Sequence, residues 1–398
     1  MAKTKTMDTG RRWLAVGHSA ASDPRQAGRE ATRGALEGTD PALLVIFSSG
    51  PDPEGLLAGI EDVCPGVPLI GCASQALIAS PGPPGPVGGV VVTALGGPGF
   101  RVTTGAASAA GDQRRAAGAA VAGCAADLPA DAGPNQILMM LTEGVLDHQE
   151  DILAGAYSVV GASAPLIGGT SGPDPGLGRS FQLHGRDVLT DAVVGAMVTS
   201  DGPFGIAMRH GGRKVGEPMI VTHSIRGDLY TLDDKPALTA YLDRLNAPPE
   251  AYADPAVFDQ FNRSRPIGIR RRGGEEVRHV NSISRLKETW LRSSGEVPEG
   301  GLIWVMQGDR DSTLEAANEA CRAAIDALDG APPLGLLAFD CISRSRVLGE
   351  EGTRDEVERM MKVCAGAPLS GFYTWGEIAR TRGITGYHNQ TLAVLAVG

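Results

Sequence analysis

The chain has 398 residues, a formal net charge of −10 at pH 7 and 42% hydrophobic residues. This length and composition predict a globular protein with two or three domains and sizeable hydrophobic cores. The acidic balance argues against general nucleic-acid binding, because an acidic surface repels phosphate backbones. The basic run Arg270–Arg272 is too short to reverse this and is better explained as a solvated strand end.

The cysteines and the first residues bear on the compartment. The six cysteines are scattered without any CxxC pair, and the start of the chain has no apolar core of the kind found in signal peptides. No apolar run approaches the ~18 residues of a membrane span. We expect a cytoplasmic protein with reduced thiols, no membrane span and no zinc-finger spacing.

The first predicted unit begins at residues 42–49, ALLVIFSS, a short apolar run that indicates a buried strand. A helix is expected over 52–66, where Asp52 can cap the first turn. The octapeptide VPLIGCAS follows at 67–74, and GGVVVTAL at 88–95 indicates another buried strand. The predicted order is therefore strand, helix, short strand, strand.

The same order of elements occurs twice more. In the second copy the strand, helix, octapeptide and closing strand are expected at 136–144, 147–162, 164–171 and 191–198. In the third copy they are expected at 334–341, 353–367, 367–374 and 390–397. The spacing differs between copies, which excludes a stacked solenoid and suits a duplicated module whose loops have diverged.

The three octapeptides VPLIGCAS, APLIGGTS and APLSGFYT share one physical pattern. Proline fixes φ on entry, apolar residues anchor a short strand, and glycine allows a turn or a close backbone approach. Small polar residues then follow, and Cys72, Ser74, Thr170 and Ser171 are expected to form the wall of a binding pocket. The alternative is a structural turn repeated by duplication.

We expect an α/β fold of two domains, in which duplicated strand–helix–strand units form mixed sheets covered by helices. Residues 1–39 form a partly flexible lead-in, 40–236 a first domain with two units, and 237–398 a second domain with the third unit. The boundary lies where the short strands expected over 204–240 give way to a helix that begins at Pro236.

The segment FDCISR places Asp340, Cys341 and Arg344 at the end of a predicted buried strand, where sites usually lie in α/β folds. Arg344 is suited to bind a carboxylate in a bidentate manner, and Cys341 to act as a soft contact or reactive thiol. The alternative is an ion pair between Asp340 and Arg344 that fixes the turn, with Cys341 as a small core residue.

The segment GFYTWGEIA concentrates Phe372, Tyr373 and Trp375 in an aromatic-poor chain, next to Glu377. Strand alternation sends Phe372 to one face and Tyr373 with Trp375 to the other. Aromatic walls with the carboxylate of Glu377 and the guanidinium of Arg344 suit a zwitterionic ligand such as an amino acid. Simple core packing is the alternative.

His388 and Asn389 precede the last predicted strand and are further candidates for ligand binding, although a single histidine is more often structural. No histidine spacing typical of zinc occurs, so no metal site is expected. Haem needs only one axial His or Cys, so spacing does not exclude it.

Catalytic patterns are weak. Residues 142–151 combine several carboxylates with His148, but a helix start capped by Asp147 explains them. No nucleophile elbow, P-loop or dinucleotide fingerprint is present. We therefore do not expect an enzyme.

The motifs VIFSS, PLIGCAS, PLIGGTS, FDCISR, PLSGFYTWGEIA and HNQTLAVLAV together resemble the FIST family, the F-box and intracellular signal transduction proteins. The resemblance covers roughly residues 40–395 in the right order. It departs from the family at Gln75 and Ala76, where a Ser-x-Gly-Glu-like turn is usual, and no F-box precedes the first domain. The resemblance implies a small-ligand sensory domain, with amino acids or similar metabolites as ligands; some relatives bind haem and sense nitric oxide.

The leading hypothesis is a cytoplasmic sensory protein that binds a small molecule and acts through a separate signalling partner. A haem-based nitric-oxide sensor is the first alternative. An enzyme or a structural adaptor is the second.

Overall fold

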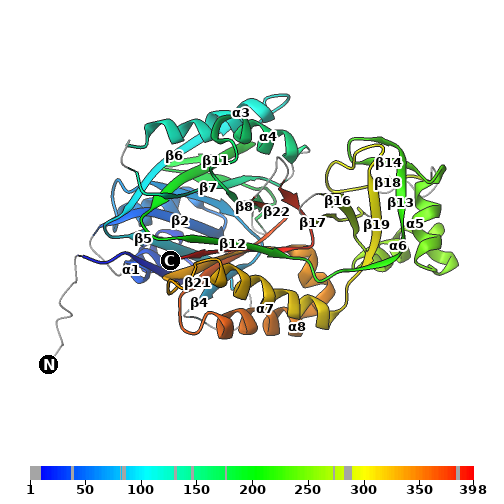
Figure 1. Cartoon of the computed structure of the whole chain (residues 1–398). Helices are drawn as coiled ribbons and strands as arrows, with labels where there is room; N and C mark the ends of the chain where they lie inside the picture. The colour runs from blue at the N-terminus through cyan, green and yellow to red at the C-terminus, as the bar shows by residue number, and fades with distance from the viewer. Residues whose placement is uncertain are drawn as a thin grey trace.

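The computed structural model describes residues 10–36, 40–80, 82, 87–129, 132–144, 148–174, 177–271, 274–281, 289–381 and 386–398. Figure 1 shows a main body of sheets with helices on its outside and a smaller lobe at one end. The six cysteines are free and buried.

The main body contains three copies of one unit within the described part of the chain. The first consists of β1 (Trp13–Ser19), α1 (Pro24–Ala35), β2 (Pro41–Ser49), α2 (Pro53–Glu61), β3 (Leu69–Ala73), β4 (Leu77–Ser80) and β5 (Gly89–Gly96). The second consists of β6 (Phe100–Ser108), α3 (Arg114–Ala122), β7 (Asn135–Glu143), α4 (Gln149–Val160), β8 (Leu166–Ser171), β9 (Gln182–His184), β10 (Asp187–Leu189) and β11 (Ala192–Ser200).

The third unit is interrupted by an insertion. It consists of β12 (Phe204–Arg209), α7 (Arg310–Asp326), β20 (Gly335–Cys341), α8 (Ile342–Val363), β21 (Leu369–Thr374), β22 (Gly376–Arg380), β23 (Tyr387–His388) and β24 (Leu392–Val397). The insertion between β12 and α7 forms the lobe: β13 (Arg213–Ile225), β14 (Asp228–Leu232), β15 (Lys235–Pro236), α5 (Ala237–Arg244), α6 (Pro255–Asn262), β16 (Ile267–Arg271), β17 (Gly274–Arg278), β18 (Leu291–Arg292) and β19 (Leu302–Gln307).

Each unit contributes the centre of one mixed sheet. The strand and its octapeptide run parallel in the pairs β2–β3, β7–β8 and β20–β21, and the closing strand is antiparallel to the first member of each pair. The strand after each octapeptide joins another unit's sheet: β4 pairs with β21, β9 with β3, and β22 with β8. The three units therefore exchange strands in a closed cycle.

The three sheets meet in one central hydrophobic core. At its centre Phe47 and Phe372 have ring centroids 4.6 Å apart, and Phe339 contacts both rings edge-on. A helix pair covers the outer face of each sheet, and separate apolar clusters lie in these three outer layers. The lobe has a hydrophobic core of its own.

The octapeptide has a clear structural reason in this fold. In all three units the proline carbonyl accepts a backbone hydrogen bond from a leucine of the preceding strand, at 2.8 or 2.9 Å. A Cβ atom at Gly71, Gly168 or Gly371 would lie only 2.5, 1.9 or 2.1 Å from a carbonyl oxygen of that strand. Only glycine permits this approach, so duplication preserved the motif for packing.

The predicted α/β fold of duplicated units in mixed sheets covered by helices is confirmed. Asp52 caps α2 as expected, accepting the Gly55 amide at 2.8 Å. His148 occupies the N-cap position of α4 with φ 62°, and the predicted cap Asp147 lies outside the described residues. The helix expected at Pro236 is α5.

The division into 1–39, 40–236 and 237–398 stays a prediction. Residue 236 falls in β15, inside the lobe, and the third unit already begins at β12. Within the lead-in, β1 and α1 together occupy 19 of the 39 residues.

Candidate functional site

Strand register assigns equivalent positions in the three units. Leu69, Leu166 and Leu369 pair with the same place in β2, β7 and β20, so Ser74, Ser171 and Thr374 are equivalent. By the same criterion Leu77, Gln182 and Glu377 are equivalent in the exchanged strands. Predicted site residues from three distant segments therefore lie at related places around the main body.

Glu377 is fully buried and lies on the face of the sheets that points to the central core. Its carboxylate accepts hydrogen bonds from Thr374 Oγ1, from Thr391 Oγ1 at 2.7 Å and from the Thr391 amide at 3.2 Å. Burial raises its pKa to about 7, although these hydrogen bonds act in the opposite direction. The neighbouring thiol of Cys341 is also buried, which raises its pKa.

Gln182 has the same position in the second unit that Glu377 has in the third. Its amide nitrogen donates to Ser171 Oγ at 2.8 Å and to Glu143 Oε2 at 3.4 Å, and its oxygen accepts from the Ala192 amide at 3.3 Å. Glu143 is 4% exposed. This cluster thus brings the predicted Ser171 together with a carboxylate that sequence reasoning had assigned to a helix start.

The remaining octapeptide residues have mainly structural surroundings. Ser74 Oγ donates to the carbonyl oxygens of Tyr373 and Ala76, each at 2.9 Å, and the contact with Tyr373 links the first unit to the third. Cys72 lies in the central core, and burial raises its pKa. Thr170 Oγ1 is buried without a hydrogen-bond partner in the described part of the chain.

A second cluster, formed by Asp340, Arg344, Glu356 and Tyr373, lies on the outer face of the third unit's sheet, between β20–β21 and α7–α8. We call it the charge cluster. Arg344 Nε lies 2.9 Å from Asp340 Oδ1, and its Nη2 contacts Glu356 and donates to the Thr313 carbonyl at 3.1 Å. All four members are at most 2% exposed.

The charge cluster holds one guanidinium between two carboxylates. Its formal charge is −1 when both acids are ionised, which is unfavourable in a buried site. Burial and the nearby Glu356 accordingly raise the pKa of Asp340, against the effect of Arg344. Arg344 Nη1 and the Tyr373 hydroxyl have no hydrogen-bond partner among the described residues. Buried polar side-chain atoms without protein partners are rare, so these two donors are candidates for contact with a bound molecule.

The α8 helix is broken between two members of the charge cluster. The helical backbone is interrupted at Gly349, where φ is 68° and ψ is −179°, with Arg344 before the break and Glu356 after it. Thr353 Oγ1 donates to the Gly349 carbonyl at 2.7 Å and fixes the second half. The two carboxylates therefore belong to segments joined by a glycine hinge.

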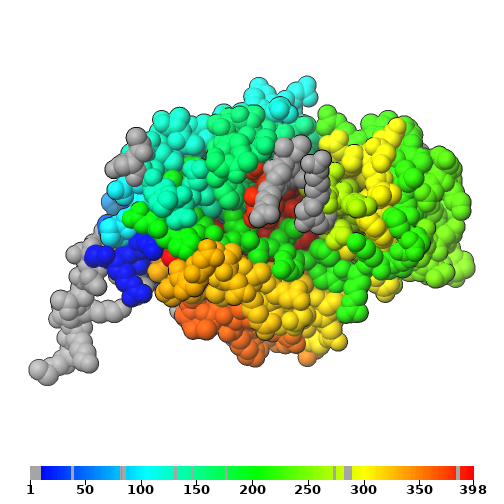
Figure 2. Space-filling view, in the orientation of Figure 1, coloured from blue at the N-terminus to red at the C-terminus, as the bar shows by residue number. Residues whose placement is uncertain are grey.

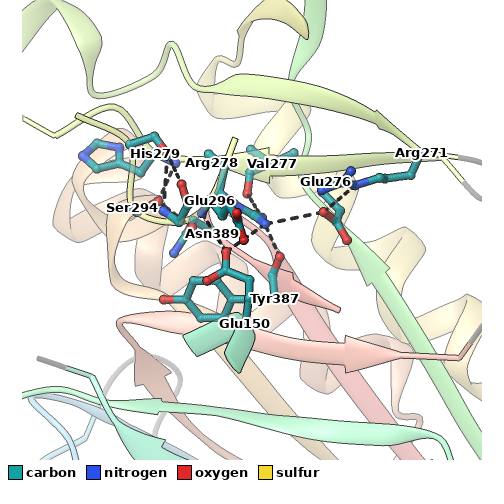
Figure 3. A network of polar contacts seen from close by, with 12 residues as sticks. Glu150, Arg271, Glu276, Val277, Arg278, His279, Ser294, Glu296, Tyr387 and Asn389 are labelled. Atoms are coloured by element: carbon teal, nitrogen blue, oxygen red, sulfur yellow. Dashed lines mark hydrogen bonds and ion pairs between the residues drawn. The ribbon is translucent and has the colours of Figure 1, made fainter. Parts of the chain in front are cut away.

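His388 ends β23, and Asn389 follows it where the main body contacts residues of the lobe (Figure 3). The Asn389 amide donates to the Val277 carbonyl at 3.1 Å, and its side-chain oxygen accepts from Ser294 at 2.5 Å. His388 donates to the Ala379 carbonyl at 3.3 Å, and burial lowers its pKa to about 4.

Arg278 is the centre of this junction and was not predicted from the sequence. Its side chain is fully buried; Nη1 donates to the Tyr387 carbonyl at 2.6 Å, and Nη2 lies 3.2 Å from Glu150 and 3.4 Å from Glu276 (Figure 3). Glu150 also accepts the Glu296 amide at 2.8 Å. Glu143 and Glu150, two of the carboxylates near His148, therefore contact different partners.

Trp375 is the partly exposed aromatic of the predicted group, with 37% of its surface accessible. Its amide donates to the Thr170 carbonyl at 3.0 Å, its Cβ atom lies against Gly144 and its ring lies against Gly172. In the space-filling view, C-terminal residues are visible in the recess between the main body and the lobe (Figure 2).

The predicted residues therefore divide into distinct groups. Phe372 lies in the central core and Tyr373 in the outer layer, which confirms the expected strand alternation. Arg344 and Glu377 lie on opposite faces of the sheets and share no hydrogen-bond partner among the described residues. The zwitterion hypothesis requires one pocket that holds both Arg344 and Glu377, and the structure does not bring these two side chains together.

Sequence reasoning missed Glu356 and Gln182. Glu356 belongs to a charged helix that has no motif marking it as buried, and its contact with Arg344 spans the break in α8 at Gly349. Gln182 becomes recognisable once the register aligns it with Glu377.

Metal and haem binding find no support at the predicted residues. No group of three or more metal-ligating side chains occurs within the residues that the structure describes. Cys72, Cys341 and His388 are buried and packed or hydrogen-bonded, without the open face that an axial haem ligand requires. No described helix is both long and apolar enough to cross a membrane.

Comparison with known proteins gives two family matches. Residues 42–235 match the FIST N domain model and residues 237–380 match the FIST C domain model. An uncharacterized protein of Mycobacterium tuberculosis is 27% identical over 403 residues, covering 96% of this chain and 98% of its own length. An uncharacterized protein of Methanocaldococcus jannaschii is 24% identical over 192 residues, covering 46% of this chain and 36% of its own.

Proposed function

Because the chain belongs to the FIST family, whose domains are associated with sensory roles in signal transduction, we propose that it senses a small zwitterionic metabolite such as an amino acid, bound at the charge cluster. The observation that carries this proposal is the set of buried, unmatched polar groups around Arg344.

The surplus negative charge of the cluster selects for a cation. Without a ligand, a proton on the pair Asp340 and Glu356 offsets the extra charge, as the raised pKa of Asp340 indicates. A ligand ammonium group supplies the same positive charge and several hydrogen-bond donors. Ligand binding would then release a proton, so affinity should increase with pH.

The unmatched donors select for an anion at the other end of the ligand. Arg344 Nη1 and the Tyr373 hydroxyl both offer hydrogen bonds that no described residue accepts. A carboxylate accepts both, and charge-assisted hydrogen bonds of this kind are stronger than neutral ones. A molecule with an ammonium and a carboxylate on one carbon atom, as in an α-amino acid, offers a partner to both kinds of group in the cluster.

The hinge at Gly349 gives the ligand a route and the protein a response. Entry requires the segment carrying Glu356 to move relative to Arg344, and the break in α8 lies between them. We propose that this movement is read by a separate signalling partner. The six free cysteines suit a reducing compartment, and we propose the cytoplasm.

The test is calorimetric titration with the common amino acids, each compared with its decarboxylated amine and its deaminated acid. We expect one class of zwitterion to bind and the two truncated forms to bind at least about tenfold more weakly, since each loses one charged contact. Tyr373→Phe should lower the affinity roughly tenfold without destabilising the fold.

Tyr252→Phe is the matched control, because Tyr252 lies in the lobe with its hydroxyl on Asp243. The proposal is wrong if no zwitterion binds at millimolar concentration, or if Tyr373→Phe and Tyr252→Phe bind equally well.

A further inference from the structure

A groove of about 670 Å³ opens on the main body where the first and second units adjoin. It lies between α2, the start of β3, the strand β6 and the turn from β9 to β10. Buried Leu57, Ile60 and Leu69 give it an apolar floor, and Glu54, Glu61 and Arg186 lie along it.

At the corresponding place between the second and third units, the side chain of Arg380 occupies the space. Arg380 pairs with Leu166 in the β22–β8 ladder. Its equivalent follows from the β9–β3 ladder, where His184 pairs with Ile70 and the next residue, Gly185, donates its amide to the Leu69 carbonyl at 3.0 Å. Gly185 therefore stands where Arg380 stands, without a side chain.

The contacts of Arg380 define what that place binds. Its Nη2 donates to the Ala164 carbonyl at 2.6 Å and to the Gly161 carbonyl at 3.0 Å, at the C-terminal end of α4. Its guanidinium lies 4.8 Å from the centre of the Tyr157 ring. Helix C-terminal carbonyls carry partial negative charge, so the position favours a cation with several donors.

The groove has carbonyl and carboxylate oxygens whose negative charge would attract such a cation. Cys64 and Val67 line it after the end of α2 at Glu61, and by their distance from the following proline they correspond to Gly161 and Ala164 in the other unit. Glu61 is paired with Arg186, whereas Glu54 has no ion pair with any residue of the described ranges. Glu54 is therefore the carboxylate of the groove that can pair with a bound cation.

We propose that this groove binds a small organic cation made of a guanidinium group on a short alkyl stem. The guanidinium takes the place held by that of Arg380 in the neighbouring unit, and the stem lies over Leu57 and Leu69. Planar guanidinium suits two carbonyl acceptors better than a compact ammonium does. This site is separate from the charge cluster and does not depend on the function proposed for it.

The experiment titrates the full chain with n-butylguanidinium, n-butylammonium and n-butanol by calorimetry, with methyl NMR of Leu57, Ile60 and Leu69 to locate binding. We expect n-butylguanidinium to bind at least about tenfold more tightly than n-butanol and several-fold more tightly than n-butylammonium. Its methyl shifts should be confined to the groove.

Two substitutions at one position provide the matched pair. Gly185 has φ 57°, a conformation that asparagine tolerates, and a Cβ there meets no atom within 4 Å. Gly185→Asn should leave affinity within about twofold, whereas Gly185→Arg should fill the groove and lower it at least about tenfold. Glu54→Gln should lower it several-fold.

Equal binding of n-butylguanidinium and n-butanol, or equal affinity in Gly185→Asn and Gly185→Arg, would overturn the proposal. Methyl shifts away from the groove would overturn it as well. If Gly185→Arg fails to fold, the comparison of Glu54→Gln with the unchanged chain decides the same question.

Discussion

The carboxylate of Glu377 and the carboxamide of Gln182 occupy equivalent positions in two units, and each accepts a hydrogen bond from a backbone amide at the start of its unit's closing strand, β24 or β11. The Thr391 amide donates to Glu377 at 3.2 Å and the Ala192 amide to Gln182 at 3.3 Å. One place in the fold thus accepts an acid in one unit and its neutral isostere in another.

Glu377→Gln should remove a pH dependence of stability. The pKa of Glu377 is about 7 in the folded protein and near 4.5 when unfolded, so the folded state binds the proton more tightly. Wild-type stability is therefore greatest below pH 4.5 with respect to this group and falls by roughly 2–3 kcal/mol between pH 5 and pH 8. Urea unfolding across this range, compared with exposed Glu350→Gln, measures it. Parallel curves for wild type and Glu377→Gln would contradict the prediction.

Arg344→Met should destabilise the protein strongly. It leaves Asp340 and Glu356 buried without their common cation, and breaking a buried ion pair from one side costs about 3–5 kcal/mol. Arg354→Met is the control, because its partner Glu350 is 92% exposed and the pair contributes little. The free energy of unfolding by urea distinguishes the two, and equal values for both variants would show that the charge cluster is not a buried ion-pair network.

Mild acid should loosen the junction between the lobe and the main body. Burial lowers the pKa of His279 and His388 to about 4, below the unfolded value near 6.5. Both therefore contribute stability above pH 6.5 that is lost as the pH falls towards 4, roughly 2 kcal/mol each between pH 7 and pH 5.

The measurement is the unfolding free energy of His388→Gln at these two pH values. We expect the variant to lose less stability than wild type on acidification. His223→Gln, whose side chain is half exposed, should change the pH dependence by less than about 1 kcal/mol. The same slope in wild type and His388→Gln would refute the assignment.

Gly155→Ala should separate α3 from α4. A Cβ at Gly155 would lie 1.9 Å from the Arg115 carbonyl oxygen, so the helices must move apart, at about 2–4 kcal/mol. Gly123 has helical dihedrals and no atom within 4 Å of a Cβ, so Gly123→Ala should be neutral or slightly stabilising. Thermal unfolding compares the two, and similar melting temperatures would contradict the close packing.

The sequence predicts the repeated unit well, because its signals are local. A short apolar run, a capped helix and a Pro-Leu-x-Gly strand are each defined by neighbouring residues, and Asp52 caps its helix as expected. The exchange of strands between units is a long-range event. Nothing near Leu77 or Glu377 says that its strand pairs with another unit's sheet.

The sequence named the candidate residues but not how they are distributed in space. Tyr373 and Arg344 lie together on the outside of the third unit's sheet, whereas Glu377 faces the central core from the second unit's sheet, because β22 joins that sheet after β21. Glu356 was missed because a helix of charged residues gives no sign of which one is buried. The face on which a side chain lies depends on long-range packing, which the neighbouring residues in the sequence do not encode.

The start of β1 lies next to the last residue of the chain. Arg12, which precedes β1, donates from Nη1 to the carbonyl oxygen of Gly398 at 2.5 Å, just beyond the end of β24. In a ring of units that lend strands to one another, no unit is first or last, so a chain reopened at an exposed turn and sealed by a short linker should still reach the same architecture.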